Sequence, residues 1–244
     1  MNIAFIGFGK VSYTLSKLIQ SSDINLFTST ENRSDNTIDL IKKSNVEVFP
    51  SYSEAIEKSD IVISAVTPST ALEAAEKCRN TDVIYLDLNN ISPITALKIN
   101  NVVDNFVDGA IIGKIDAENP VLYLSGNDSD KLLFLNDYLD VRIISDNVGD
   151  ASKIKLLRST YTKSLSVLLI ECYSLASSLS LEEEFFNILS LTEGEEFKNK
   201  SLSRINNTLK SSKRKAEELE EILEYFGDED LEMVKTALDK FKQF

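Results

Sequence analysis

The chain has 244 residues, of which 43% are hydrophobic and 27% are charged, and its formal net charge is −13 at pH 7. This length and hydrophobic content suit a soluble globular protein with one large domain or two modest ones. The acidic charge argues against binding to nucleic acid and against adhesion to anionic membranes. Because the sequence contains no histidine, His-ligated metals and a His general base are excluded, and we expect no metal site.

The two cysteines, Cys78 and Cys172, lie far apart, and each falls within a helical pattern. We therefore expect reduced thiols and no disulfide. No apolar run reaches membrane-spanning length, and Met1 leads directly into the first expected strand with no signal segment. Together these features predict a cytoplasmic protein.

The first eighteen residues carry the strongest motif. Residues 2–6 form a short apolar run that predicts a buried strand, and beyond a glycine turn Leu15 and Leu18 recur at helical spacing. Strand, glycine turn and helix in this order open a dinucleotide-binding unit, although the third fingerprint position holds Ser12. A glycine turn of some other α/β protein is the alternative. We expect a pyrophosphate to contact the turn residues Gly7, Phe8, Gly9, Lys10 and Val11.

The second expected strand, 24–28, runs into a polar loop. A fold selective for NAD usually carries an acidic residue here for the ribose 2′-hydroxyl, and Glu31 offers one. Hydroxyl groups and a guanidinium suit a 2′-phosphate instead, so the loop favours NADP over NAD. The expected contacts are Thr28, Ser29, Arg33 and Ser34.

Strands and helices then continue to alternate. Expected strands at 46–49, 60–66, 83–88, 106–113, 121–125 and 141–144 are separated by expected helices at 37–43, 52–58, 69–78, 93–99 and 128–138. Such alternation predicts a parallel, doubly wound sheet whose ligands lie where the strands end. We expect Val66, Thr67 and Pro68 to contact the cofactor, and residues 89–92 to border the cofactor cleft.

The pattern changes near residue 149. Residues 151–178 contain no Gly or Pro and keep helical spacing, which predicts a helix of about 42 Å. Residues 181–244 are also helical in pattern, and Lys213 and Lys215 with neighbouring glutamates predict a solvated helix face. The fold class is therefore α/β, with a Rossmann domain of mostly parallel sheet at 1–147 and an all-α domain for substrate and dimerisation at 148–244.

Several segments together resemble the β-hydroxyacid dehydrogenase superfamily, and specifically its 6-phosphogluconate-dehydrogenase-like branch with a C-terminal helical domain of poorly defined function. The matching segments are 6–9, 28–34, 85–93, 106–113, 122–126, 149–155, 162–163 and 213–222. The resemblance implies an oxidoreductase that transfers a hydride between NADP(H) and a small hydroxy or keto acid. It also implies a homodimer formed through the helical domain, whose long helix has more apolar surface than the trailing residues readily cover.

In the superfamily a lysine on the long helix is the general acid/base, and Lys155 matches it. On a helix, Ala151, Lys155, Ser159 and Thr162 share one face. The substrate contacts implied by the resemblance are Asn89, Asn90, Ile112, Gly113, Arg158, Ser159 and Thr162.

The chain departs from the superfamily at the substrate positions. Many members carry Ser-Gly-Gly where this chain has Ile112, Gly113 and Lys114, and paired asparagines where it has Arg158 and Ser159. Arg158 and Lys163 offer positive charge for an anionic substrate group. Two alternatives stay open: a non-catalytic NADP-binding or scaffold protein, and a reductase of imines or deazaflavins on the same fold.

Overall fold

The computed structural model describes residues 1–227 and 229–244. The chain forms two compact units, Met1–Lys155 and Leu156–Phe244, here named the sheet unit and the helical unit. Their division falls inside the long helix α6 (Asp150–Ser178), so the first residues of this helix belong to the sheet unit. The boundary predicted after residue 147 lies just before α6 begins.

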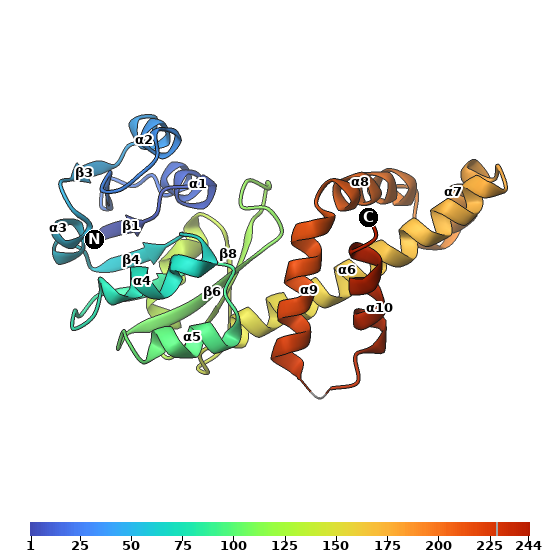
Figure 1. Ribbon diagram of the computed structural model, residues 1–244. Helices are drawn as coiled ribbons and strands as arrows, with labels where there is room; N and C mark the ends of the chain where they lie inside the picture. Colours follow the sequence, from blue (N-terminus) through green and yellow to red (C-terminus); the bar gives the residue numbers. More distant parts are fainter. Residues whose placement is uncertain (228) are drawn as a thin grey trace. The chain divides into compact units, whose positions relative to one another are not determined.

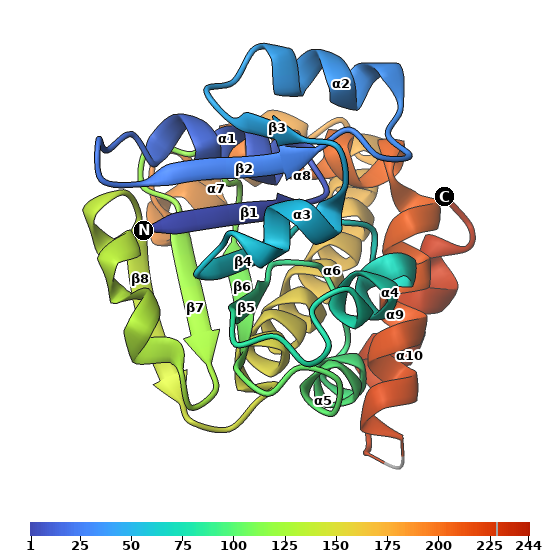
Figure 2. The same ribbon diagram turned by 90° about the vertical axis from the view of Figure 1, so that its left-hand side faces the viewer.

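The sheet unit is built on one sheet of eight strands in the order β3-β2-β1-β4-β5-β6-β7-β8 (Figures 1 and 2). The strands are β1 (Asn2–Ile6), β2 (Asn25–Ser29), β3 (Glu47–Phe49), β4 (Ile61–Ser64), β5 (Ile84–Asp87), β6 (Phe106–Ile112), β7 (Val121–Ser125) and β8 (Asp140–Ser145). All neighbouring strands are parallel except β6 and β7, which pair antiparallel. The predicted fold class, a doubly wound and mostly parallel sheet, is confirmed.

Helices cover both faces of this sheet. One buried apolar cluster contains residues of α1 (Lys10–Leu18), α2 (Asp35–Lys42) and the 3₁₀-helix η2 (Ser129–Asp137). The other contains residues of α3 (Tyr52–Glu57), α4 (Ala71–Glu76) and α5 (Pro93–Asn100). Central strands buried on both sides explain the continuous apolar runs in the sequence. The structure differs from the expected helix 69–78 in that its start is a separate 3₁₀ turn, η1 (Pro68–Thr70).

The strand order reverses beside β1, which pairs with β2 on one side and with β4 on the other. Ile6 at the end of β1 lies in register with Ser64 at the end of β4. Connections leaving these two strands run to opposite sides of the sheet, and a crevice therefore forms at their carboxyl ends. The glycine turn and the segment after β4 meet at this point.

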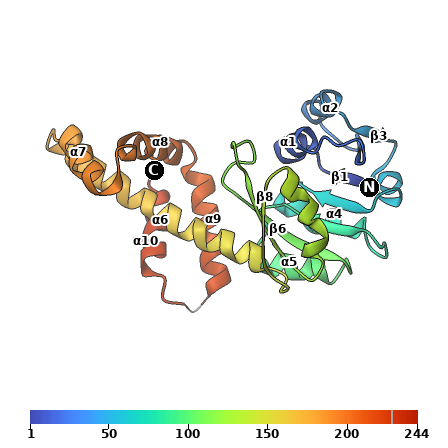
Figure 3. The ribbon, with the colours of Figure 1, turned by 180° about the vertical axis from the view of Figure 1, so that it is seen from behind.

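The helical unit contains the rest of α6 with α7 (Glu182–Glu193), α8 (Phe197–Lys210), α9 (Ser212–Phe226) and α10 (Glu232–Phe241) (Figure 3). One core joins Val167 of α6 to α9 and α10, and a second joins α6 to Ile205 of α8. The all-α character of this part is confirmed. Lys215, expected on a solvated face, is instead half-buried. No helix among the described residues is long and apolar enough to cross a membrane.

Candidate dinucleotide site and its buried acid network

The glycine turn after β1 has a conformation that only glycine tolerates. Gly7 has φ +82°, and a Cβ there would lie 2.5 Å from the carbonyl oxygen of Ala65. The hydroxyl of buried Ser12 donates to the carbonyl of Gly7 at 2.7 Å. A serine at the third fingerprint position is therefore small enough to pack the helix on the strand, and it also fixes the turn.

The start of α1 is open to a ligand. A Cβ on Gly9 would have no neighbour within 4 Å, and no side chain caps the helix at this N-cap residue. Backbone N–H groups in the first turn of a helix have no partner within the helix, and they attract anions together with the helix dipole. This end of α1 is thus suited to a pyrophosphate.

A cleft of about 510 Å³ lies beside this turn. Its lining residues are Ile6, Gly7, Phe8, Gly9, Arg33, Thr37, Tyr52, Ala65, Val66, Thr67, Thr70, Glu73, Ala74 and Lys77. The structure therefore brings together residues that the sequence analysis drew from three separate segments: Gly7, Phe8 and Gly9; Arg33; and Val66 and Thr67. The cleft lies entirely within the sheet unit.

Other expected cofactor contacts lie outside the cleft lining. Thr28 and Ser29 are fully buried; the Thr28 hydroxyl donates to Phe5 O at 3.0 Å, and the Ser29 hydroxyl accepts from the N–H of Glu31. The Lys10 ammonium is exposed and pairs with Asp116 at 2.7 Å. Val11 is the second residue of α1, Ser34 is the N-cap of α2, and Pro68 opens η1.

Two cations stand over one buried ring at the cleft. The Arg33 guanidinium lies 5.5 Å and the Lys77 ammonium 6.0 Å from the centroid of the Tyr52 ring. Burial raises the pKa of the Tyr52 hydroxyl, whereas the nearby Arg33 lowers it. The carboxylate of Glu31 is turned aside and accepts from the N–H of Tyr52, the first residue of α3. Sequence reasoning missed Tyr52 and Lys77 because they come from later in the chain, at the start of α3 and directly after α4.

A second feature of the site is a buried polar row across four strands. Ser64, Asp87, Asp108 and Ser125 pair in register along β4, β5, β6 and β7, and all four are fully buried. Buried carboxyl groups are costly unless they are hydrogen-bonded or paired with a cation. The hydrogen-bond partners of Asp87 and Asp108 therefore show which segments the polar row fixes to the sheet.

Asp87 is bound by Asn89. The backbone N–H and the side-chain amide of Asn89 donate to the two Asp87 carboxylate oxygens at 2.8 and 2.7 Å. The amide also donates to the Ser64 hydroxyl, and its oxygen accepts from the N–H of Val66. Asn89, expected at the substrate, is thus buried and connects Asp87 to the cleft segment at Val66. Asn90 is exposed.

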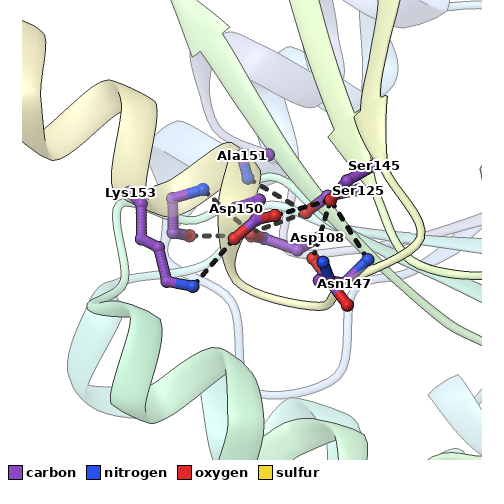
Figure 4. A network of polar contacts seen from close by, with 8 residues as sticks. Asp108, Ser125, Ser145, Asn147, Asp150, Ala151 and Lys153 are labelled. Carbon is purple, nitrogen blue, oxygen red and sulfur yellow. Dashed lines mark hydrogen bonds and ion pairs between the residues drawn. The ribbon is translucent and has the colours of Figure 1, made fainter.

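Asp108 holds the start of α6 (Figure 4). The Ser152 N–H and hydroxyl donate to its two oxygens at 2.8 and 2.7 Å, while the Ala151 N–H donates to the Ser125 hydroxyl at 2.9 Å. Because a helix leaves its first N–H groups unpaired, these bonds anchor α6 to the sheet. They fix the position of Lys155, which follows Ser152 by almost one turn.

Lys155 lies where it interacts with both buried carboxyl groups. Burial raises the pKa of Asp87 to about 7, and hydrogen bonds from Asn89 and the charge of Lys155 oppose that rise. Burial likewise raises the pKa of Asp108, opposed by Ser152, Ser125 and Lys155. A buried carboxyl with a pKa of about 7, close to a second buried carboxyl of raised pKa and to an amine, is suited to acid–base chemistry. Among the described residues, no group of acidic or cysteine side chains is arranged to hold a metal ion.

The remaining expected substrate residues lie in two places. Ile112 ends β6, and Gly113 follows it with φ +89°. Arg158, Ser159 and Thr162 belong to the helical unit. There, the Ser159 hydroxyl accepts a hydrogen bond from Lys163, and the Thr162 hydroxyl donates to the Ser159 carbonyl at 3.3 Å.

The fold and the cleft define the class of nucleotide-binding domain to which the sheet unit belongs. An NAD(P)-binding domain carries a glycine turn against the end of a helix and a cleft at the point where the strand order reverses. Residues 2–90 match the model of the family described as NADP oxidoreductase, coenzyme F420-dependent. These residues therefore belong to a nucleotide-binding domain of oxidoreductase type.

Two similar proteins cover the whole chain. An uncharacterized 28.5 kDa protein of Methanothermus fervidus is 40% identical over 99% of this chain and 98% of its own length. The solved structure of a conserved protein of unknown function, reported for its similarity to 3-hydroxyacid dehydrogenases, is 35% identical, covers 100% of this chain and 96% of that one, and superposes with a TM-score of 0.86. The chain belongs to the family of these two proteins, which has the β-hydroxyacid dehydrogenase-like NAD(P)-binding fold with a C-terminal helical domain.

More distant structures share the fold. The 3-hydroxyisobutyrate dehydrogenase of Mycobacterium tuberculosis is 17% identical over 100% of this chain and 93% of that one, with a TM-score of 0.79. An imine reductase of Bacillus cereus is 14% identical over 99% and 92%, with a TM-score of 0.65. The predicted resemblance to the β-hydroxyacid dehydrogenases is confirmed at the level of the fold, which dehydrogenases and imine reductases share.

Replacing Asp87 by Asn tests the raised pKa of the buried carboxyl. Its folded-state pKa of about 7 lies above its ordinary value of 3.8, so between these values the folded protein binds more protons than the unfolded chain. Folding stability then falls as pH rises through this window, by up to about 1.4 kcal/mol per pH unit. We expect Asp87→Asn to lose this slope in urea titrations at roughly pH 5 and pH 7, whereas exposed Asp104→Asn keeps it. A slope in Asp87→Asn equal to that of the wild type would contradict the raised pKa.

Proposed function

We propose that the protein is an NADP-dependent oxidoreductase of the β-hydroxyacid dehydrogenase type, acting on a small hydroxy or keto acid. The observation that carries this proposal is the position of Lys155. It stands on a helix anchored to the sheet through Asp108, beside two buried carboxyl groups of raised pKa. The bonds of Asn89 connect this network to the cofactor cleft.

The proposed chemistry divides between cofactor and protein. NADP supplies the hydride acceptor or donor when bound. Lys155 takes the proton of the substrate hydroxyl in oxidation, or returns a proton to the carbonyl oxygen in reduction. Asp87 and Asp108 stabilise the charged amine, because buried carboxyl groups favour a neighbouring cation. The bonds from Ser152 hold the helix, so the amine stays in one place through the proton transfer.

The preference for NADP rests on Arg33 and Lys77. Both side chains line the cleft and stand over Tyr52, whereas Glu31 is engaged by the start of α3. A guanidinium binds phosphate through parallel hydrogen bonds and an ammonium adds a second charge. Glu73 also lines the cleft, at its α4 wall. The 2′-phosphate of NADP is the group that these two cations fit.

Arg33→Gln and Lys77→Gln test the cofactor preference. Each variant removes one charged partner of the 2′-phosphate, so we expect the Kd for NADPH to rise about 10-fold or more in each. The Kd for NADH should change little, because NADH lacks that phosphate. Fluorescence titration measures both values, and exposed Lys43→Gln serves as a control. Equal losses of NADPH and NADH affinity would place these side chains elsewhere on the cofactor.

Lys155→Met tests the acid–base role. We expect kcat to fall about 10²- to 10⁴-fold with a competent hydroxy or keto acid, because a positioned proton donor contributes that much. NADPH affinity should stay within about twofold, since Lys155 is absent from the cleft lining. Lys153→Met is the matched control, because Lys153 is on the same helix and pairs with Asp150. Full turnover by Lys155→Met would remove the assigned role.

A second candidate is reduction of another acceptor on the same fold. It is favoured by the family model over 2–90, whose description names coenzyme F420, and by the fold shared with imine reductases. Ile112 also favours this candidate, because it stands where many superfamily members carry the serine that holds the substrate carboxylate. Consumption of NADPH with a deazaflavin or a cyclic imine, and none with a panel of hydroxy and keto acids, would select this candidate.

We also propose that the protein is a homodimer that pairs through the helical unit. Tyr161, Leu168 and Leu175 of α6 are 67%, 50% and 66% exposed, and their spacing places them on one stripe of the helix. Leu179, directly after α6, is 68% exposed. On α7, Ile188 and Leu191 are 66% and 86% exposed. Apolar side chains in such number are typical of an interface.

Light scattering tests the dimer. We expect twice the chain mass of 27.3 kDa at micromolar concentration. The double variant Leu168→Glu and Leu175→Glu should give a monomer, because it buries two charges in the interface. Asn199→Glu, an exposed change on α8, should leave the mass unchanged. A monomeric wild type would contradict the proposal.

A further inference from the structure

Three helices of the helical unit bring cationic side chains together. Lys163 of α6, Arg204 of α8 and Lys215 of α9 form this group, here named the cationic cluster. Lys163 is the most buried, with a side chain 7% exposed, and its ammonium pairs with Glu218 of α9 at 2.6 Å. It also donates to the Ser159 hydroxyl.

The other two cations have no carboxylate partner among the described residues. The Lys215 ammonium donates to the hydroxyl of Thr208 at 2.6 Å, and Thr208 is fully buried. Nη1 of Arg204 is buried and has no hydrogen-bond partner. A buried N–H group without an acceptor is rare in folded proteins, and leaving it unpaired is costly.

The charges of the cluster do not balance. The cluster and its neighbour Arg214 carry four positive charges, and Glu218 and Glu221 carry two negative ones, which leaves two positive charges. Glu218 pairs with both Lys163 and Arg214, and the charge of Lys163 acts on Glu221. Burial, and then the charges of Lys163 and Arg214, lower the pKa of Lys215; Arg204 adds to this effect, and Glu218 opposes it. Mutually repelling cations are unexpected in a core that only needs to pack, and in a chain of net charge −13.

We propose that Arg204, Thr208 and Lys215 form a binding site for an oxyanion, the phosphate or carboxylate group of a small molecule. Such a group would accept hydrogen bonds from the unpaired Nη1 of Arg204, from the Lys215 ammonium and from the Thr208 hydroxyl. Its negative charge would offset the repulsion between the cations. Lys163, held by Glu218, adds positive potential behind the site. The site lies within the helical unit, and the inference holds whether or not the chain transfers a hydride.

Thermal unfolding of the full chain tests this site. In inorganic phosphate, compared with chloride at equal ionic strength, the apparent Tm of the wild type should rise in a saturable way. At ten times Kd the expected rise is about 3–6 °C. Malonate and glycerol phosphate, as separate arms, distinguish a carboxylate from a phosphate and a free ion from a phosphate ester. No saturable rise with any of the three would overturn the proposal.

The variant Lys215→Met decides between a ligand site and a structural ion cluster. A ligand site predicts that its Tm in chloride equals or exceeds that of the wild type, because repulsion is relieved, while the anion-dependent rise is lost. Lys213→Met, on the same helix and exposed, should keep the rise. A full rise in Lys215→Met overturns the proposal whatever its Tm in chloride.

Arg204→Gln provides a second test if Lys215→Met folds poorly, and it should also lose the rise. Phosphate can bind to the glycine turn of the sheet unit as well. For this reason Arg33→Gln, which acts on the cofactor cleft, should retain the rise. The Tm measurements do not depend on NADPH binding or turnover. The anion site can therefore fail its test while the proposed activity passes, and the reverse.

Discussion

The attachment of α6 to the sheet through Asp108 is the constraint on which the proposed chemistry depends. A fully buried carboxyl in the middle of β6 accepts both donors of Ser152, and Ser125 on the next strand accepts from Ala151. Hydrogen bonds to a charged acceptor are strong, and helix N-terminal donors are well matched to it. The first turn of α6 is therefore held in place by the sheet, and so is Lys155, which follows in the next turn.

Both units concentrate unfavourable electrostatics in one place each. In the sheet unit, two acids with raised pKa stand in register on neighbouring strands, next to one lysine. In the helical unit, Arg204 and Lys215 stand together, and among the described residues neither has a carboxylate partner in an ion pair. Sequences usually satisfy local rules throughout, and departures tend to mark functional positions. The crowded charges are acidic in the sheet unit and basic in the helical unit. Acidic groups suit the proposed proton transfer, and basic groups suit the proposed anion site.

Much of the fold could be predicted because its signals are local. The alternation of apolar runs and helical patterns predicted the sheet, and the absence of Gly and Pro in 151–178 predicted the long helix. The site was harder. Thr28 and Ser29 follow the polar-loop pattern, yet β2 is covered on both faces and buries them. Lys77 and Tyr52 reach the cleft only through tertiary packing. In the sequence Lys215 has the pattern of a surface lysine, because its burial depends on the packing of α8 against α9.

The reversal of β7 has a consequence for how a ligand enters. Because β7 runs antiparallel to β6, the chain returns directly along the sheet, and the intervening loop stays at the carboxyl end of β6. From there Asp116 reaches Lys10 at the glycine turn, and both side chains remain largely in water. Ion pairs of this kind contribute little to stability. The loop after β6 is therefore joined to the start of α1 by one weak ion pair, and an anion bound at the glycine turn would compete with Asp116 for Lys10.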